Sequence, residues 1–419
     1  MTEIYTSYFY FILVCMTEFS YIMLLNIFLL NYDSRSKLMQ RSDGWFLAML
    51  ENATSYASFQ GYHGARWPKM VGPNTALSAA AAANKTCSID CGSVGNTTYS
   101  NSSYPLLYWT GPSSTGPMLI WQQPHIIWMT ELQRLNAASD SAANAIVQRM
   151  SKVIEATADF MASYPSPPLS DSESSDELWL GPPTDGAEEG NPQKSTWNPT
   201  FELTYWRLSL QIATEWRERA GEKPKAAWAN VLAKLATPTV LPAQAGGKHG
   251  AYAYAVNANC WGFPSDADES KEGKHKCSGA YKSHPMMLGA LGMINGRAVT
   301  PPIEDAIMNA TVAYAIDGWE WKGTWGWDFP IFAMSMIRLK WSSSNVVAML
   351  LRNETKNVYL TSGHNYQSAG LSCYLPGNGG LLAAVAMMAG GFMDGEGKTV
   401  RVGFPTEWNA RAEGFGVYP

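Results

Sequence analysis

The chain has 419 residues, of which 46% are hydrophobic and 16% charged, and its formal net charge is −5. The charged fraction is low against the roughly 25% of typical soluble domains, which excludes a disordered chain and implies a large buried interior. Because no basic excess is available to neutralise phosphates, nucleic acid is not expected as a partner. At about 150 residues per domain the length predicts two or three domains, although helical barrels of this size form one unit.

The N-terminal segment is apolar. Between Ile4 and Leu30 the only charge is Glu18, so the run is long enough to span a bilayer. Glu18 would cost about 2.5–3.5 kcal/mol at the bilayer centre. The positive start of a signal peptide is missing, because the first basic residue is Arg35. A membrane anchor, buried helices and a truncated start all stay open, and we favour the last two together.

Cysteines and glycosylation sequons favour an extracellular compartment. Cys87 and Cys91 lie four residues apart, and Cys260 and Cys277 flank a polar loop, so two local disulfides fit, although all six cysteines could be free thiols. Neither spacing is that of a zinc site, so we expect no metal. Six sequons, about twice the number expected by chance, begin at Asn52, Asn84, Asn96, Asn101, Asn309 and Asn353. We expect a secreted glycoprotein.

Helical periodicity dominates the rest of the chain. Residues 140–164 carry one apolar stripe, which predicts an outward amphipathic helix that stops before Pro165. Residues 203–217, 329–339 and 380–390 are apolar on nearly all sides and should be buried on both faces. An alternation of one-sided and two-sided helices is typical of a double ring. We therefore predict an all-α fold, a toroid of paired helices.

Long loops rich in Gly, Pro, Ser and Asn separate the predicted helices, over residues 84–117, 165–200, 240–283, 317–328 and 353–380. Loops of this length are usually functional or disordered, and their aromatic and acidic residues favour function. Alternating residues predict a short hairpin within 248–262. No composition break marks a second domain, so we expect an N-terminal segment over residues 1–40 and one domain over residues 41–419.

An acidic loop is the first candidate for chemistry. Asp185, Glu188 and Glu189 lie within five residues, before a predicted buried helix. A glycosidase needs one carboxyl group that stays protonated, and crowding beside aromatic walls raises a carboxyl pKa. A solvated acidic loop is the alternative. Glu202 is interpreted as a helix N-terminal acid that the helix dipole favours.

The second candidate is a tryptophan-rich loop before Asp328. Its four tryptophans are Trp319, Trp321, Trp325 and Trp327. We expect that so short a loop cannot bury all four, so some should line a cleft and make Asp328 a possible base. A plain helix N-cap role would also explain Asp328.

Polar residues in other loops form the third group. His364, Gln367 and Asn378 are suited to bind hydroxyl groups, although Asn378 also fits a turn and His364 a plain surface position. His125 heads a predicted helix and is similar. The chain carries no nucleotide-binding or zinc-protease motif, so no cofactor is expected.

Several segments together resemble one group of enzymes. Gly61-Tyr-His-Gly-Ala-Arg-Trp-Pro resembles the Gly-Tyr-x-Gly-Ala-Arg-Phe-Pro segment of glycoside hydrolase family 65, and Gln122-Gln-Pro-His125 resembles the following segment of that family. Residues 180–206, 324–330 and 374–380 look like fungal six-hairpin glycosidases of the family 65 and family 95 type. The resemblance extends over about residues 45–395.

The resemblance implies an (α/α)6 barrel with its active site at one mouth, and an inverting glycoside hydrolase that acts on an α-linked sugar. The general acid would be Glu189, with Glu188 as the near alternative. The base would stand before the next inner helix, at Asp328. Family 95 carries an Asp in its last loop where this chain has Pro376, which favours Asp328.

The expected substrate contacts complete the prediction. Aromatic walls would come from Tyr62, Trp67, Trp325 and Trp327, and hydroxyl contacts from Arg66, His125, His364, Gln367 and Asn378. Carbohydrate is the expected partner. The family's N-terminal β-sandwich is missing here, which keeps a sugar-binding barrel without turnover as an alternative. A disaccharide phosphorylase ranks third, because Lys322 is the only basic residue close to Asp328 in the sequence.

Overall fold

The computed structural model describes residues 36–69, 118–168, 176–189, 193–194, 196–243, 248–256, 284–354 and 356–419, with side chains from residue 43 onward. Predictions that lie outside the described residues concern the apolar run 4–30, the two cysteine pairs and the sequons at Asn84, Asn96 and Asn101. Among the described residues, no helix has the length and apolar character needed to cross a bilayer.

About half of the described residues lie in helices and very few in strands, which confirms the all-α class. The helices are α3 (Ser36–Phe59), α5 (His125–Leu135), α6 (Asp140–Ser163), α7 (Thr200–Arg219), α8 (Ala226–Lys234), α9 (Met286–Gly292), α10 (Asp305–Gly318), α11 (Asp328–Arg338), α12 (Ser343–Leu350) and α13 (Leu375–Gly390). Short 3-10 turns cover Gly296–Ala298 and Thr406–Trp408. Two antiparallel ribbons pair β1 (Val240–Leu241) with β2 (Ala251–Tyr252) and β3 (Phe392–Met393) with β4 (Thr399–Val400).

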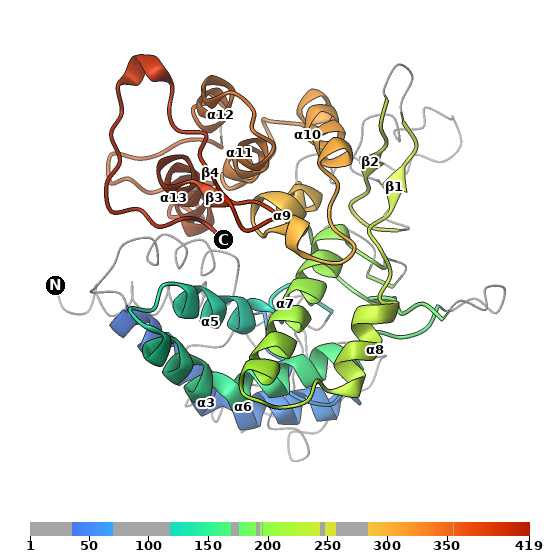
Figure 1. Cartoon of the computed structure of the whole chain (residues 1–419). Coiled ribbons are helices and arrows are strands. Elements are labelled where there is room, and N and C mark those ends of the chain that lie inside the picture. Colours follow the sequence, from blue (N-terminus) through green and yellow to red (C-terminus); the bar gives the residue numbers. More distant parts are fainter. Residues whose placement is uncertain are drawn as a thin grey trace, which may run out of the picture.

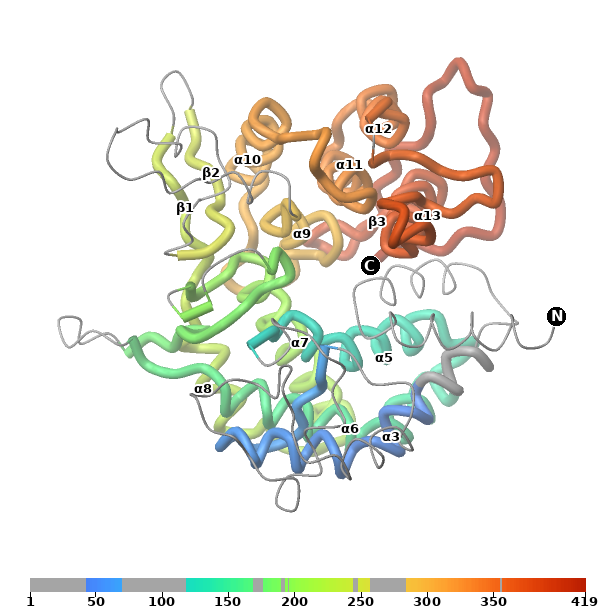
Figure 2. The backbone as a smooth tube through the Cα atoms, turned by 180° about the vertical axis from the view of Figure 1, so that it is seen from behind, coloured from blue at the N-terminus to red at the C-terminus, as the bar shows by residue number. Residues whose placement is uncertain are grey.

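The helices form two layers. In the inner layer, α5 packs on α7, α7 on α9, α9 on α11, and α11 on α13, so that these helices trace an arc (Figure 1). Helices α6, α8, α10 and α12 pack on the outside of this arc. Helix α3 lies against α6, as the view from behind also shows (Figure 2).

The predicted helices are confirmed, with small changes at their ends. Helix α6 begins after Ser139, whose hydroxyl caps the helix by accepting a hydrogen bond from the Ala142 N–H, and it ends just before Pro165. Helix α7 is buried over most of its length, and Trp206 is fully buried where α7 meets α6. The Trp206 indole N–H donates to the Met161 carbonyl at 2.8 Å, which fixes the contact between the inner and outer layers.

The prediction for the start of α13 was wrong. Residues 374–380 were expected as a loop, but α13 already begins at Leu375 and includes Pro376 and Gly377. A proline is tolerated in the first turn of a helix because that turn needs no N–H donor. Glycine fits at Gly377 because an added Cβ would lie 2.5 Å from Oδ1 of Asn365.

The predicted hairpin also differs. Tyr252 pairs with Val240, which precedes the segment 248–262, and Val256 forms a bridge with Trp197 instead. The ribbon therefore links the chain after α8 to residues 248–256, and it holds Tyr254 next to the start of α7, where the Thr200 N–H donates to the Tyr254 carbonyl at 2.8 Å.

Candidate active site

The acidic loop lies against the N-terminal end of α7. The Ala187 N–H donates to Oε1 of Glu202 at 2.7 Å. Glu202 lies in the first turn of α7, as predicted, and it is fully buried. Glycine is required at Gly186, because an added Cβ would lie 2.3 Å from the Tyr254 hydroxyl. The loop is therefore packed onto the protein, which contradicts the alternative of a solvated acidic loop.

Two carboxyl groups of this cluster have strongly shifted acidities. Burial, together with the nearby charges of Glu189 and Glu202, raises the pKa of Asp185 to about 8, although a hydrogen bond from Gln193 and the charge of Lys69 oppose the shift. Burial also raises the pKa of Glu202 to about 7. Both groups therefore retain protons above the usual pH range of a carboxyl group.

The predicted acid Glu189 is more accessible. Its Oε2 lies 2.6 Å from Nζ of Lys69, and its side chain is 30% exposed. Its backbone φ of 56° is left-handed, within the tight turn in which the Glu189 N–H donates to the Gly186 carbonyl. Glu188 is buried. Of the two alternatives for the acid, Glu189 is thus the one with an open side chain.

Asp328 lies at the first residue of α11 and is fully buried. Its Oδ2 accepts a hydrogen bond from the Trp325 N–H at 2.9 Å and another from the Thr324 hydroxyl. These contacts hold the tryptophan loop in shape. In this conformation the Asp328 carboxyl group holds the tryptophan loop through hydrogen bonds and has no contact with bulk water.

His284 is a functional candidate that sequence reasoning missed. Its Nδ1 lies 3.0 Å from Oδ1 of Asp328 and 2.6 Å from Nε1 of Trp327. An indole N–H only donates and Nδ1 has a single lone pair, so Nδ1 accepts from Trp327 when it is unprotonated and donates to Asp328 only when it carries the proton. Burial raises the pKa of Asp328, while the charge of His284 and the hydrogen bonds from His284, Thr324 and the Trp325 N–H oppose the shift. The one available signal was a histidine that directly precedes a buried helix.

The expectation that the loop cannot bury all four tryptophans is confirmed, although the loop buries three of them. Trp319, Trp321 and Trp327 are buried, and only Trp325 is partly exposed. Trp319 and Trp321 pack on Phe332 of α11, with ring centres 5.7 and 5.0 Å away. The loop buries them because it folds back across α11.

The segment around Trp121 contacts both the acidic loop and the tryptophan loop that precedes Asp328. The Ile120 N–H donates to the Asp185 carbonyl at 3.2 Å, which ties the acidic loop to the segment that carries Trp121. The Trp121 ring centre lies 6.2 Å from that of Trp327, which in turn contacts His284. The segment that carries Trp121 therefore contacts both loops.

The predicted sugar contacts around residue 66 are structural. Arg66 is buried, and its guanidinium lies 5.5 Å from the Phe160 ring and 5.8 Å from the Tyr164 ring. Trp67 is 2% exposed, and its indole donates to the Thr157 hydroxyl. Tyr62 is partly buried and packs on Tyr164. Arg66 and Tyr62 both contact Tyr164, whose hydroxyl donates to the Pro183 carbonyl at the start of the acidic loop.

His125 is buried between Trp121 and Tyr205, with its Nδ1 3.3 Å from the Tyr205 hydroxyl. Burial lowers the pKa of His125 to about 3, so the ring is neutral. Its Nε2 is buried and has no hydrogen-bond partner among the described residues. His125 therefore lies behind Trp121, in the wall of the candidate site.

The side-chain amides of Gln367 and Asn378, which were predicted to bind sugar, form hydrogen bonds within the protein. Gln367 accepts a hydrogen bond from the Gly326 N–H and donates to the Thr324 carbonyl, so it clamps the tryptophan loop. Asn378 bonds to the backbone of Asn365 and Gly363. His364 is partly exposed in the same turn, 3.4 Å from the Ser362 hydroxyl. Gln367 and Asn378 shape the loops rather than offer free amides.

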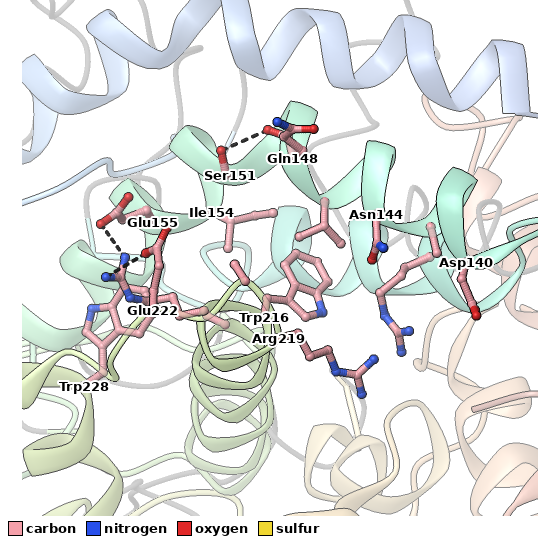
Figure 3. Close-up of a pocket in the computed structure, with 16 residues that line it drawn as sticks. Asp140, Asn144, Gln148, Ser151, Ile154, Glu155, Trp216, Arg219, Glu222 and Trp228 are labelled. Atoms are coloured by element: carbon pink, nitrogen blue, oxygen red, sulfur yellow. Dashed lines mark hydrogen bonds and ion pairs between the residues drawn. The ribbon is translucent and has the colours of Figure 1, made fainter.

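A separate cavity of about 710 Å³ lies between α6 and the C-terminal end of α7 (Figure 3). It is lined by Asn144, Gln148, Trp216 and several charged residues. At 1.5 Å per residue, Trp216 lies roughly 20 Å along α7 from Glu202. The cavity is thus remote from Glu202 and from the acidic loop that packs on it.

A scan against models of known protein families and a search of curated proteins both return no match for this chain. Among the described residues, no three acidic, histidine or cysteine side chains have an arrangement that could hold a metal ion.

Proposed function

We propose that the protein is an inverting glycoside hydrolase that acts on an α-linked glycoside and that its helices belong to an (α/α)6 barrel of the family 65 and family 95 type. The observation that carries the proposal is the contact through Trp121, which brings the carboxyl cluster around Asp185 and the centre around Asp328 to one region. An inverting mechanism needs two carboxyl groups on opposite sides of a sugar, about 6.5–9.5 Å apart.

The proposed roles follow from accessibility. Glu189, with Glu188 as the alternative, donates a proton to the departing oxygen while the bond from that oxygen to the anomeric carbon breaks. Asp328 takes a proton from the water that attacks the anomeric carbon. Because Asp328 is fully buried and its Oδ1 lies against His284, substrate binding has to open this network before the base can act.

One observation favours a second function, a carbohydrate-binding barrel without turnover. Both oxygens of Asp328 are engaged by neighbours, so a protein that keeps this network closed would hold a sugar and leave its glycosidic bond intact. The partly exposed Trp325 still offers a ring face on which a sugar could stack.

The deciding experiment is a screen of α-linked glycosides with proton NMR of the first product. The hydrolase proposal expects the β-anomer, and it expects Glu189→Gln and Asp328→Asn each to lower kcat by about 10²-fold or more, with glycan affinity kept. Glu413→Gln, a change of the same kind at an exposed position, should be neutral.

The other outcomes are equally informative. Affinity for a glycan without hydrolysis supports the binding barrel. Release of the α-anomer contradicts inversion. Loss of activity in Glu188→Gln but not in Glu189→Gln moves the acid to Glu188.

A further inference from the structure

The carboxyl groups of Asp185 and Glu202 are buried beneath the loop that carries the proposed acid. Asp185 is 1% exposed and Glu202 is fully buried. Oδ1 of Asp185 and Oε2 of Glu202 have no hydrogen-bond partner among the described residues. A buried oxygen that lacks donors cannot stabilise a negative charge, so this arrangement suits carboxyl groups that carry a proton.

Both carboxyl groups also hold the loop together. Glu202 accepts the hydrogen bond from the Ala187 N–H, and Asp185 accepts one from the side chain of Gln193 at 2.8 Å. The backbone of Asp185 pairs on both sides with the segment before Trp121: its N–H donates to the Met118 carbonyl at 2.9 Å. A movement of Asp185 would therefore displace the loop and the Trp121 wall together.

We propose that the carboxyl groups of Asp185 and Glu202 form a proton-dependent latch, which holds residues 181–189 in place while both carry a proton and releases them when they ionise. Ionisation places two like charges in a buried space, and the loop can hydrate them only by moving outward. The consequence for catalysis rests on the proposed function, because the loop carries Glu189.

The charged and titratable groups that face the latch have opposite effects. Lys69 is the cation that favours ionisation of Asp185. Tyr254, Tyr164, Glu188 and Glu189 face the two carboxyl groups from the other sides, and none of them carries a positive charge. Within the described part of the chain, the effect of Lys69 is outweighed and the balance favours the protonated state, in accord with the raised pKa of both acids.

Peptide-resolved hydrogen exchange tests the latch without any knowledge of the substrate. After correction for intrinsic exchange, the protection of residues 181–189 should fall about tenfold or more between about pH 5.5 and about pH 8.5. In the double variant with Asp185→Asn and Glu202→Gln, neutral amides replace the carboxyl groups, and protection should stay constant over this range. Glu413→Gln should behave as the wild type.

Two results would overturn the latch: protection in the wild type that does not change with pH, or a double variant that folds and keeps the wild-type loss. If the double variant does not fold, the wild-type profile still decides. A latch that opens in a protein without hydrolytic activity would reject only the proposed function. An active enzyme whose loop stays protected would reject only the latch.

Discussion

Asn365 positions the tryptophan loop from behind, although it was not a predicted site residue. It is fully buried, and its side-chain amide N–H donates to the Val358 carbonyl at 3.2 Å. Its Oδ1 faces the backbone of Gly326 and Gly377 so closely that neither position has room for a side chain. The two glycines therefore let the tryptophan loop and α13 approach the same residue.

Gly326→Ala should destabilise the protein. The new Cβ would lie 1.9 Å from Oδ1 of Asn365, so the tryptophan loop has to move. Overpacking of this kind costs about 1–3 kcal/mol, measured as a lower free energy of unfolding in urea. Gly370→Ala is the matched control, because nothing lies within 4 Å of its Cβ position. Equal stabilities for the two variants would contradict this account.

Helix α6 joins the layers of the fold, since it packs on α5, α7, α8 and α3. The cavity of Figure 3 lies between the N-terminal part of α6 and the C-terminal end of α7. Arg217 fills part of this space with ion pairs to Glu155 and Glu222. The second half of α6 carries the buried stripe and supports the acidic loop through Tyr164, at its C-terminal end.

A single substitution should measure how much the N-cap of α6 contributes to the free energy of unfolding. Ser139→Ala removes the acceptor of the Ala142 N–H and should lower the free energy of unfolding by about 1 kcal/mol. Ser139→Asp should keep most of that stability, because aspartate is also a good cap. Ser141→Ala makes the same change inside the first turn, where no cap is lost, so a loss as large as that of Ser139→Ala would refute the cap assignment.

At the scale of the whole molecule, buried ionisable groups set the pH dependence of stability. Asp185 and Glu202 have raised pKa values of about 8 and about 7. Their contribution is complete below the pKa of an unfolded carboxyl, near pH 4, and is lost as pH rises toward 8. His125 acts in the opposite direction, because its lowered pKa of about 3 costs stability as pH falls below about 6.5.

The free energy of unfolding should therefore decline from about pH 5 to about pH 8, by an amount on the order of several kcal/mol. Urea titrations across this range measure the slope. The double variant Asp185→Asn with Glu202→Gln should show a much flatter curve. A wild-type stability that rises over the same range would exclude a protonated carboxyl cluster.

Local sequence patterns determined the helical class and most helix positions. Apolar periodicity and a following proline predicted α6, and apolar residues on all sides predicted α7 and α11 as inner helices. A helix that is buried on one face needs apolar residues on that face only, whereas a helix that is buried on both faces needs them on all sides. The acidic loop and Asp328 were also identifiable, since carboxyl groups near aromatic residues are rare enough to single out.

Only the tertiary structure decided how these candidates are used. Arg66, Gln367 and Asn378 were expected to bind sugar, yet their side chains bind other parts of the protein. His284 and Trp121 became candidates through contacts with partners far away in the sequence. Whether a polar side chain faces a ligand or the backbone depends on which distant segments lie beside it, and that is fixed by packing rather than by local pattern.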